Sequence, residues 1–157
     1  MTNQNASSTS ARRGATGGAD RGPRPVKWVS FVGSGPGDPG LLTVRALELL
    51  REAEIVITET DDHEQLVRSV LGLPAPVETE GDGEPAEQVG PVFVDGGFGE
   101  DGQPLTHASR AKVVVRQAKT GKRVVRLMSG DPFLYASGPE EAQACAKAAV
   151  SCSAVAI

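Results

Sequence analysis

The sequence predicts an α/β domain in which a mostly parallel sheet carries helices on both faces. From residue 26 onward, short β-branched runs alternate with longer segments in which apolar residues recur at the helical period. Two glycine-rich turns follow apolar runs, as the strand ends of such sheets often require. A length of 157 residues, with 39% hydrophobic and 23% charged, corresponds to one ordinary globular domain.

The first 25 residues differ from the rest in composition. They contain four arginines, one aspartate and almost no large apolar side chains, so we expect residues 1–25 to be a disordered basic tail without a nucleic-acid partner. No apolar run approaches the roughly 18 residues that cross a bilayer, and no apolar stretch follows Arg12 and Arg13 as a secretion signal requires. The sequence therefore predicts a cytoplasmic protein without a membrane partner, with its ordered domain at residues 26–157.

The first half of the domain is predicted to hold two strands and two helices. Residues 26–33 form a strand because valine and aromatic residues dominate them. Residues 41–53 form a helix with one apolar stripe at spacings of three and four. The run Ile-Val-Ile-Thr at residues 55–58 is short and apolar, as buried parallel strands are. Asp61 or Asp62 caps the second helix, which ends at the Gly-Leu-Pro that follows it.

The second half continues this alternation after an acidic loop rich in glycine and proline. Residues 92–94 form a short strand within that loop. Thr106 caps a helix, and residues 123–128 form another buried strand. Pro139 opens the last helix, and residues 153–157 begin one more strand. Units of this kind give a sheet with right-handed crossovers.

Charge is segregated along the chain. Residues 59–101 carry twelve carboxylates and one arginine, whereas residues 110–126 carry seven lysines and arginines and no acid. We interpret this as a solvated acidic loop and a solvated basic helix face. The alternative is a basic face that attracts an anionic substrate.

Four residues that often carry chemistry are interpreted as structural. Cys145 and Cys152 have no histidine or cysteine cluster near them in the sequence, so we expect no metal site and treat both as small apolar fillers. His63 and His107 each stand alone beside a predicted helix start, which favours surface or capping roles.

The two glycine-rich turns are the candidate ligand loops, because ligands of such sheets bind at the carboxyl ends of the strands. Residues 33–40, GSGPGDPG, lack the dinucleotide fingerprint because Asp38 stands where its third glycine belongs, and they lack the Gly-Lys-Ser/Thr of a phosphate loop. Residues 129–133, SGDPF, repeat the order of glycine, carboxylate and proline. Two such loops facing one pocket suit a small zwitterionic or cationic ligand.

Two long motifs contain these turns, namely FVGSGPGDPGLLTVRALELLREAEIVITE and GKRVVRLMSGDPFLYASGPEEA. Together they resemble the tetrapyrrole methylase family over residues 29–59 and 121–149, and the acidic middle matches loosely. The resemblance implies S-adenosylmethionine-dependent C-methylation of a tetrapyrrole, with uroporphyrinogen III methylated twice to precorrin-2 on the way to sirohaem and cobalamin. It also implies a two-domain fold with the active site between the domains, and a homodimer.

The resemblance assigns cofactor contacts to the two loops. The first loop of the family touches the cofactor at the position of Pro36. The Gly-Gly-Asp loop of the family falls on Ser129, Gly130 and Asp131, and an apolar contact follows at Leu134. Serine replaces a glycine here, which requires that this residue have no positive φ.

The resemblance also assigns a catalytic residue and shows departures. The Tyr-Asp pair of the family is Thr58-Glu59 here, so Glu59 is the predicted general base. The proton-donating lysine of the family is missing, with Gly96 or a neighbour in its place. The family continues into a second domain beyond the position of Ile157, so we expect this chain to represent the first domain, with weak cofactor binding and little turnover alone. The alternatives are a later precorrin methyltransferase and a noncatalytic Rossmann-like interaction module.

Overall fold

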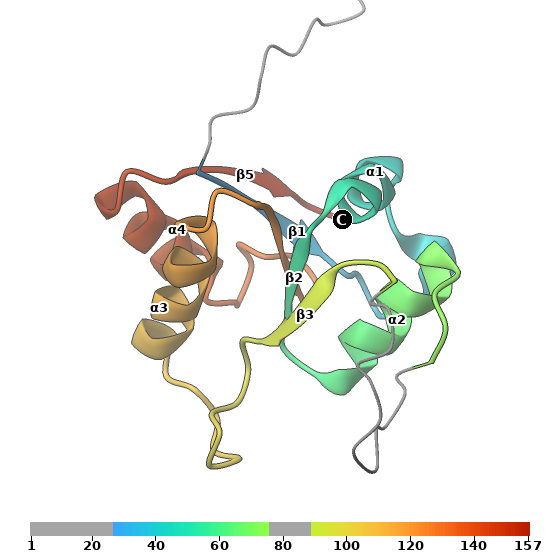
Figure 1. Ribbon diagram of the computed structural model, residues 1–157, viewed down its shortest axis with the longest axis horizontal. Coiled ribbons are helices and arrows are strands. Elements are labelled where there is room, and N and C mark those ends of the chain that lie inside the picture. The colour runs from blue at the N-terminus through green and yellow to red at the C-terminus, as the bar shows by residue number, and fades with distance from the viewer. Residues whose placement is uncertain (1–26, 76–88) are drawn as a thin grey trace, which may run out of the picture.

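The computed structural model describes residues 27–75 and 89–157, and the predicted tail, residues 1–25, lies outside them. Helices and strands alternate as the sequence predicts (Figure 1). In order, the elements are β1 Trp28–Gly33, the 3-10 turn η1 Pro39–Leu41, α1 Val44–Glu52, β2 Ile55–Thr58, α2 Asp61–Leu71, β3 Val92–Asp95, α3 His107–Ala118, β4 Arg123–Met128, α4 Gly138–Lys147 and β5 Ser151–Val155.

The strands form one five-stranded sheet in the order β3-β2-β4-β1-β5, and each neighbouring pair is parallel. The predicted α/β fold class is therefore confirmed. Strand β5 starts at Ser151, two residues before the predicted start. Because all strands run the same way, the loops after β1, β2 and β4 emerge at one edge of the sheet.

The core has two layers, one on each face of the sheet. Helices α1 and α2 cover one face, and α3 and α4 cover the other (Figure 1). Successive side chains of a strand point to opposite faces, so Val125 and Leu127 of β4 pack toward α1 and α2, whereas Val124 and Met128 pack toward α3 and α4. No helix within the described ranges is long and apolar enough to span a bilayer.

Helix α1 begins later than its apolar stripe suggests. The Asp38 carboxylate accepts a hydrogen bond from the Gly40 N–H at 2.8 Å and starts a separate 3-10 turn. The Thr43 hydroxyl then accepts from the Ala46 N–H at 3.1 Å and caps the α-helix, which begins at Val44. The predicted start at residue 41 is therefore wrong, because two polar caps divide the segment.

Two further predictions are corrected. Thr60 occupies the N-cap position of α2, while Asp61 and Asp62 lie in its first turn, where their charges complement the helix dipole. Cys152 is exposed on β5 and does not fill the core, whereas Cys145 is buried as predicted. Burial raises the pKa of the Cys145 thiol to about 11, so this group is uncharged at neutral pH.

Candidate functional site

The loops after β1 and β4 meet at the carboxyl edge of the sheet. The last residues of these two neighbouring strands, Gly33 and Met128, are paired. Beyond them, Gly35 and Gly130 form an antiparallel bridge, in which the Gly130 N–H donates to the Gly35 carbonyl oxygen at 3.1 Å. The Ser34 N–H donates to the Met128 carbonyl oxygen at 2.8 Å. The two glycine-rich turns of the sequence are thus joined through their backbones.

Glycine is required at this junction. A Cβ atom on Gly33 would lie 2.4 Å from the Gly130 carbonyl oxygen, so a side chain there would force the loops apart. Gly35 and Gly130 both have a φ of +61°, a conformation that L-residues rarely adopt. An added Cβ at Gly130 or at Gly37 would meet no atom within 4 Å. The backbone of the joined loops therefore borders open space.

The five predicted cofactor residues lie on these joined loops. Ser129 is not among the described residues with positive φ, so serine fits where the resembling family has glycine. The Asp131 carboxylate accepts from the Phe133 N–H at 2.8 Å and shapes the second loop. Leu134 is 64% exposed. The structure brings together Pro36, Ser129, Gly130, Asp131 and Leu134 through the bridged loops, and their contact with a cofactor stays a prediction.

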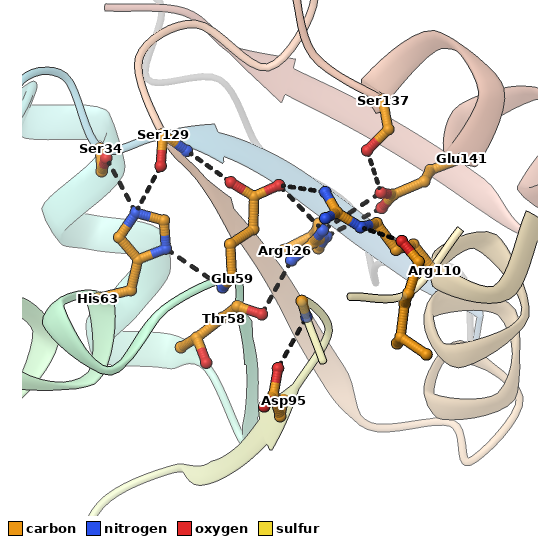
Figure 2. A network of polar contacts seen from close by, with 12 residues as sticks. Ser34, Thr58, Glu59, His63, Asp95, Arg110, Arg126, Ser129, Ser137 and Glu141 are labelled. Atoms are coloured by element: carbon orange, nitrogen blue, oxygen red, sulfur yellow. Dashed lines mark hydrogen bonds and ion pairs between the residues drawn. The ribbon is translucent and has the colours of Figure 1, made fainter. Parts of the chain in front are cut away.

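Glu59, the predicted general base, follows β2 and points toward the loop after β4 (Figure 2). Its Oε1 accepts from Nη1 of Arg110 and from Nη2 of Arg126, each at 3.3 Å. Its Oε2 accepts from the Ser129 N–H at 3.1 Å. A carboxylate has about four acceptor sites, so these contacts leave one site on Oε2 for a further proton donor. The role of general base stays a prediction.

Arg126 and Glu141 form a wholly buried ion pair, with both side chains 0% exposed. Arg126 Nε donates to Oε2 of Glu141 at 2.9 Å, and Nη2 donates to Oε1 at 3.2 Å. The Ser137 hydroxyl donates to Oε1 of Glu141 at 2.6 Å, and Arg126 Nη1 donates to the Thr58 carbonyl oxygen at 3.1 Å. Arg126 therefore ties β4 to the end of β2 and to the start of α4 (Figure 2).

The residue after β3 cannot carry a long side chain. A Cβ on Gly96 would lie 2.6 Å from Cγ2 of Ile57 and 2.9 Å from Nη1 of Arg126. The buried guanidinium of Arg126 thus occupies the space that the Cβ atom of a lysine at this position would need. A lysine at Gly96 itself would therefore collide with Ile57 and Arg126 as they are packed here.

His63 is the central site residue that the sequence analysis missed. It is 5% exposed, and its Nε2 lies 3.4 Å from Ser34 Oγ and 3.2 Å from Ser129 Oγ. Its Nδ1 accepts from the Glu59 N–H at 3.3 Å. The interpretation of His63 as a surface group is therefore wrong, whereas its contact with the Glu59 N–H at the start of α2 agrees with a capping role. Its spacing from the buried Leu66 and Val67, three and four residues later, was the available signal.

The environment of His63 favours its neutral form. Burial lowers the pKa of this imidazole below its usual 6.5, the negative charge of Glu59 opposes that shift, and the positive charge of Arg126 reinforces it. The carboxylate of Asp62 also opposes the shift. His107, by contrast, is exposed at the first turn of α3, as predicted.

A cavity of about 330 Å³ lies beside these residues at the carboxyl edge. Glu59, Arg110, Ser129 and Tyr135 are among its lining residues. A wider groove of about 800 Å³ between α3 and α4 contains none of the predicted site residues. The described parts of the chain hold no group of three His, Cys, Asp or Glu side chains that could bind a metal ion. We therefore place the candidate site at the smaller cavity and the joined loops.

Known proteins are similar to this chain in sequence and in fold. Residues 29–156 match the family model of Tetrapyrrole (Corrin/Porphyrin) Methylases. The chain is 34% identical over 157 residues to a uroporphyrinogen-III C-methyltransferase of Paracoccus denitrificans, covering 99% of this chain and 48% of that protein. It is 37% identical over 128 residues to a siroheme synthase of Baumannia cicadellinicola, covering 81% of this chain and 24% of that protein.

Solved structures agree with these relatives. The fold matches a uroporphyrin-III-C-methyltransferase from Thermus thermophilus with a TM-score of 0.61 and 23% identity, covering 84% of this chain and 48% of that one. A Thermus thermophilus structure of the same name, complexed with S-adenyl homocysteine, matches with a TM-score of 0.52 and 27% identity, covering 82% and 43%. This chain thus spans about half the length, or less, of these proteins. The match of a family model to residues 29–156, together with the sequence identity, shows that the chain belongs to the tetrapyrrole methylase family.

Proposed function

We propose that this chain is the cofactor-binding part of an S-adenosylmethionine-dependent methyltransferase that C-methylates uroporphyrinogen III to precorrin-2, for sirohaem and cobalamin synthesis. The observation that carries the proposal is the backbone junction between Gly35 and Gly130, which joins both predicted cofactor loops. The names of the relatives, uroporphyrinogen-III C-methyltransferase and siroheme synthase, support the substrate. The proposal also takes the protein to be cytoplasmic and a homodimer.

The residues of the junction fit the chemistry of S-adenosylmethionine. When bound, this cofactor supplies an electrophilic methyl group on a positively charged sulfur. The open backbone at Gly37 and Gly130 lets main-chain groups contact the polar ends of a ligand without interference from side chains. The carboxylate of Asp131 favours a positive centre nearby, and Pro36 and Leu134 offer exposed apolar surface.

The chain contributes position and proton transfer to the proposed reaction. A ring carbon of the tetrapyrrole that gains a methyl cation leaves the ring system with one proton in excess. Glu59 lines the cavity, and in this proposal the remaining acceptor site on its Oε2 takes that proton. Arg110 and Arg126 hold Oε1, so they set the direction of the carboxylate.

Titration calorimetry with S-adenosylhomocysteine tests cofactor binding by the chain. Asp131→Ala should weaken binding at least about ten-fold, because it removes both the charge and the bond to the Phe133 N–H. Asp101→Ala is the matched control, since the Asp101 carboxylate makes the same type of contact, to the Gln103 N–H at 3.1 Å, in another loop. A folded wild-type chain that binds no S-adenosylhomocysteine would contradict the proposal.

The product identifies the substrate. Because we expect little turnover from the first domain alone, the assay uses the chain joined to the second domain of a relative. Incubation of this completed protein with S-adenosylmethionine and uroporphyrinogen III should give a product heavier by two methyl groups, and its regiochemistry by NMR should be that of precorrin-2. Methylation of a later precorrin, with none of uroporphyrinogen III, would reassign the protein to the later enzymes of corrin synthesis. Cofactor binding by the completed protein without methylation of either substrate would favour the noncatalytic module.

A further inference from the structure

His63 contacts all three loops that carry predicted site residues (Figure 2). It meets Ser34 after β1, Glu59 after β2 and Ser129 after β4, although Ser34 and Ser129 are 29 and 66 residues away in sequence. We propose that His63 is a positioning residue whose neutral ring holds the loops after β1 and β4 at the spacing that the cofactor requires. The effect of His63 on cofactor binding rests on the proposed function. The spacing of the two loops can be measured in the chain without any ligand.

The hydrogen-bond partners assign the tautomer of the ring. The backbone N–H of Glu59 can only donate, so Nδ1 of His63 must present a lone pair. The proton of the neutral ring is then on Nε2 and faces the hydroxyl oxygens of Ser34 and Ser129. The Ser34 hydroxyl donates to the Gly35 carbonyl oxygen at 3.3 Å, which leaves its lone pairs for the imidazole. A protonated ring would set two N–H groups against each other at Nδ1.

This arrangement holds the loops and does not activate a serine. A nucleophilic serine gives its proton to an imidazole nitrogen, while a carboxylate holds the N–H on the other side of the ring. In this chain Nε2 already carries the proton, and Nδ1 faces an amide N–H of the backbone. His63 therefore takes no proton from Ser129.

The ring ties two glycine-rich loops to a rigid helix. His63 lies on α2, which is anchored in the core by the buried Leu66 and Val67. Glycine-rich loops lose more conformational entropy than others when they are ordered. Besides the ring, a backbone hydrogen bond from Gly130 to Gly35 joins the two loops. Loss of the ring should therefore loosen the junction even when no ligand is bound.

Side-chain NMR tests the tautomer directly. The sequence contains two histidines, so a long-range ¹H–¹⁵N spectrum shows two rings, and His63→Ala identifies the buried one by its loss. We expect His63 to be the neutral tautomer protonated on Nε2 at mildly alkaline pH. A ring protonated on Nδ1 would contradict the proposal, because it could not accept from the Glu59 N–H.

Hydrogen exchange tests whether His63 holds the loops after β1 and β4 together in the free chain. In His63→Ala, the amides of Ser129 and Gly130 should exchange about ten-fold faster, since up to three hydrogen bonds are lost. Ser30→Ala is the matched control, because it removes a buried serine hydroxyl from β1 that contacts Ser153 Oγ at 3.3 Å. This control should leave both amides unchanged.

Two further variants separate positioning from general loss of structure. His63→Gln offers an N–H to the serine hydroxyls and should restore most of the protection from exchange. Ser34→Ala combined with Ser129→Ala keeps the ring and removes only the hydroxyls that it holds, so it should loosen the loops even if His63→Ala fails to fold. Unchanged exchange of the Ser129 and Gly130 amides in this double variant would contradict the proposal that His63 holds the two loops together.

Calorimetry with S-adenosylhomocysteine tests whether the loop contacts of His63 matter for cofactor binding. The affinity should fall about ten-fold in His63→Ala and recover in His63→Gln, while Ser30→Ala binds as the wild type does. If the Ser129 and Gly130 amides of the wild-type chain exchange more slowly than those of His63→Ala, but the wild type binds no S-adenosylhomocysteine, the proposed function is contradicted. The role of His63 in holding the two loops together then still stands. A wild-type chain that binds, with loosened loops but unchanged affinity in His63→Ala, would overturn the positioning role.

Discussion

Removal of one partner of the buried ion pair should destabilise the domain strongly. Glu141 accepts two hydrogen bonds from Arg126 and one from Ser137, and neither charged side chain is exposed. In Glu141→Leu the guanidinium stays buried with only the Glu59 carboxylate and the Thr58 carbonyl oxygen as partners. Breaking a buried pair in this way costs about 3–5 kcal/mol. That is a large part of the roughly 5–15 kcal/mol that stabilises a typical domain.

Urea unfolding followed by far-UV circular dichroism measures this cost. With a slope of about 2 kcal/mol per molar urea, the midpoint of Glu141→Leu should fall by about 2 M at an unchanged slope. The double variant Arg126→Met with Glu141→Leu removes both charges, so its loss should be smaller than the sum of the single losses by at least about 2 kcal/mol. Arg45→Met is the control, because its pair with Glu48 is exposed and contributes at most about 0.5 kcal/mol. A cost below about 1 kcal/mol for Glu141→Leu, or additive single losses, would refute this reasoning.

Three other predictions concern His63, Gly33 and the cap of α1. The pKa of His63 is lower in the folded chain than its ordinary 6.5, so the stability it contributes is complete above pH 6.5 and is lost as the pH falls through the folded-state pKa. Urea unfolding across this range should show that dependence, and His63→Gln should reduce it. Gly33→Ala places a Cβ 2.4 Å from the Gly130 carbonyl oxygen, so it should cost about 1–3 kcal/mol in urea unfolding and weaken calorimetric binding of S-adenosylhomocysteine. If Gly33→Ala has the urea midpoint of the wild type, the loops after β1 and β4 can separate without cost, which would contradict this prediction. Thr43→Ala removes the hydroxyl that caps α1 and should cost about 1 kcal/mol of unfolding free energy, and an unchanged urea midpoint would contradict this capping role.

The sheet was predictable because buried parallel strands leave a strong signal in sequence. The predicted strand at residues 55–58 matches β2 at Ile55–Thr58, and the predicted strand at 123–128 matches β4 at Arg123–Met128. Helix starts were harder to predict, because single side-chain caps decide them. The apolar stripe begins at Leu42, yet Thr43 caps the α-helix and delays its start to Val44, after a separate turn capped by Asp38.

The polar network was less predictable because its members are far apart in the sequence. Patterns of hydropathy assign charged residues to the surface, whereas Arg126 and Glu141 are wholly buried. The interpretation of residues 110–126 as a solvated basic helix face is wrong for Arg126, which lies in β4 and is buried. Which carboxylate pairs with it depends on the packing of α4 against the sheet, and no local pattern contains that information.

Glu59 and Gly96, two positions at which the resemblance implies departures from the family pattern, both border the buried guanidinium of Arg126. The Glu59 carboxylate reaches the Ser129 N–H, and it also pairs with Arg126, whose guanidinium occupies the space beside Gly96. A shorter Asp at position 59 would withdraw the carboxylate by one methylene from these partners, and a Lys at position 96 would meet the guanidinium. A change at position 59 or 96 would therefore disturb contacts of Arg126, whereas glycine at position 129 would keep the backbone N–H that Glu59 accepts. A side chain at Gly96 is thus incompatible with the position that the Arg126 guanidinium takes in this packing.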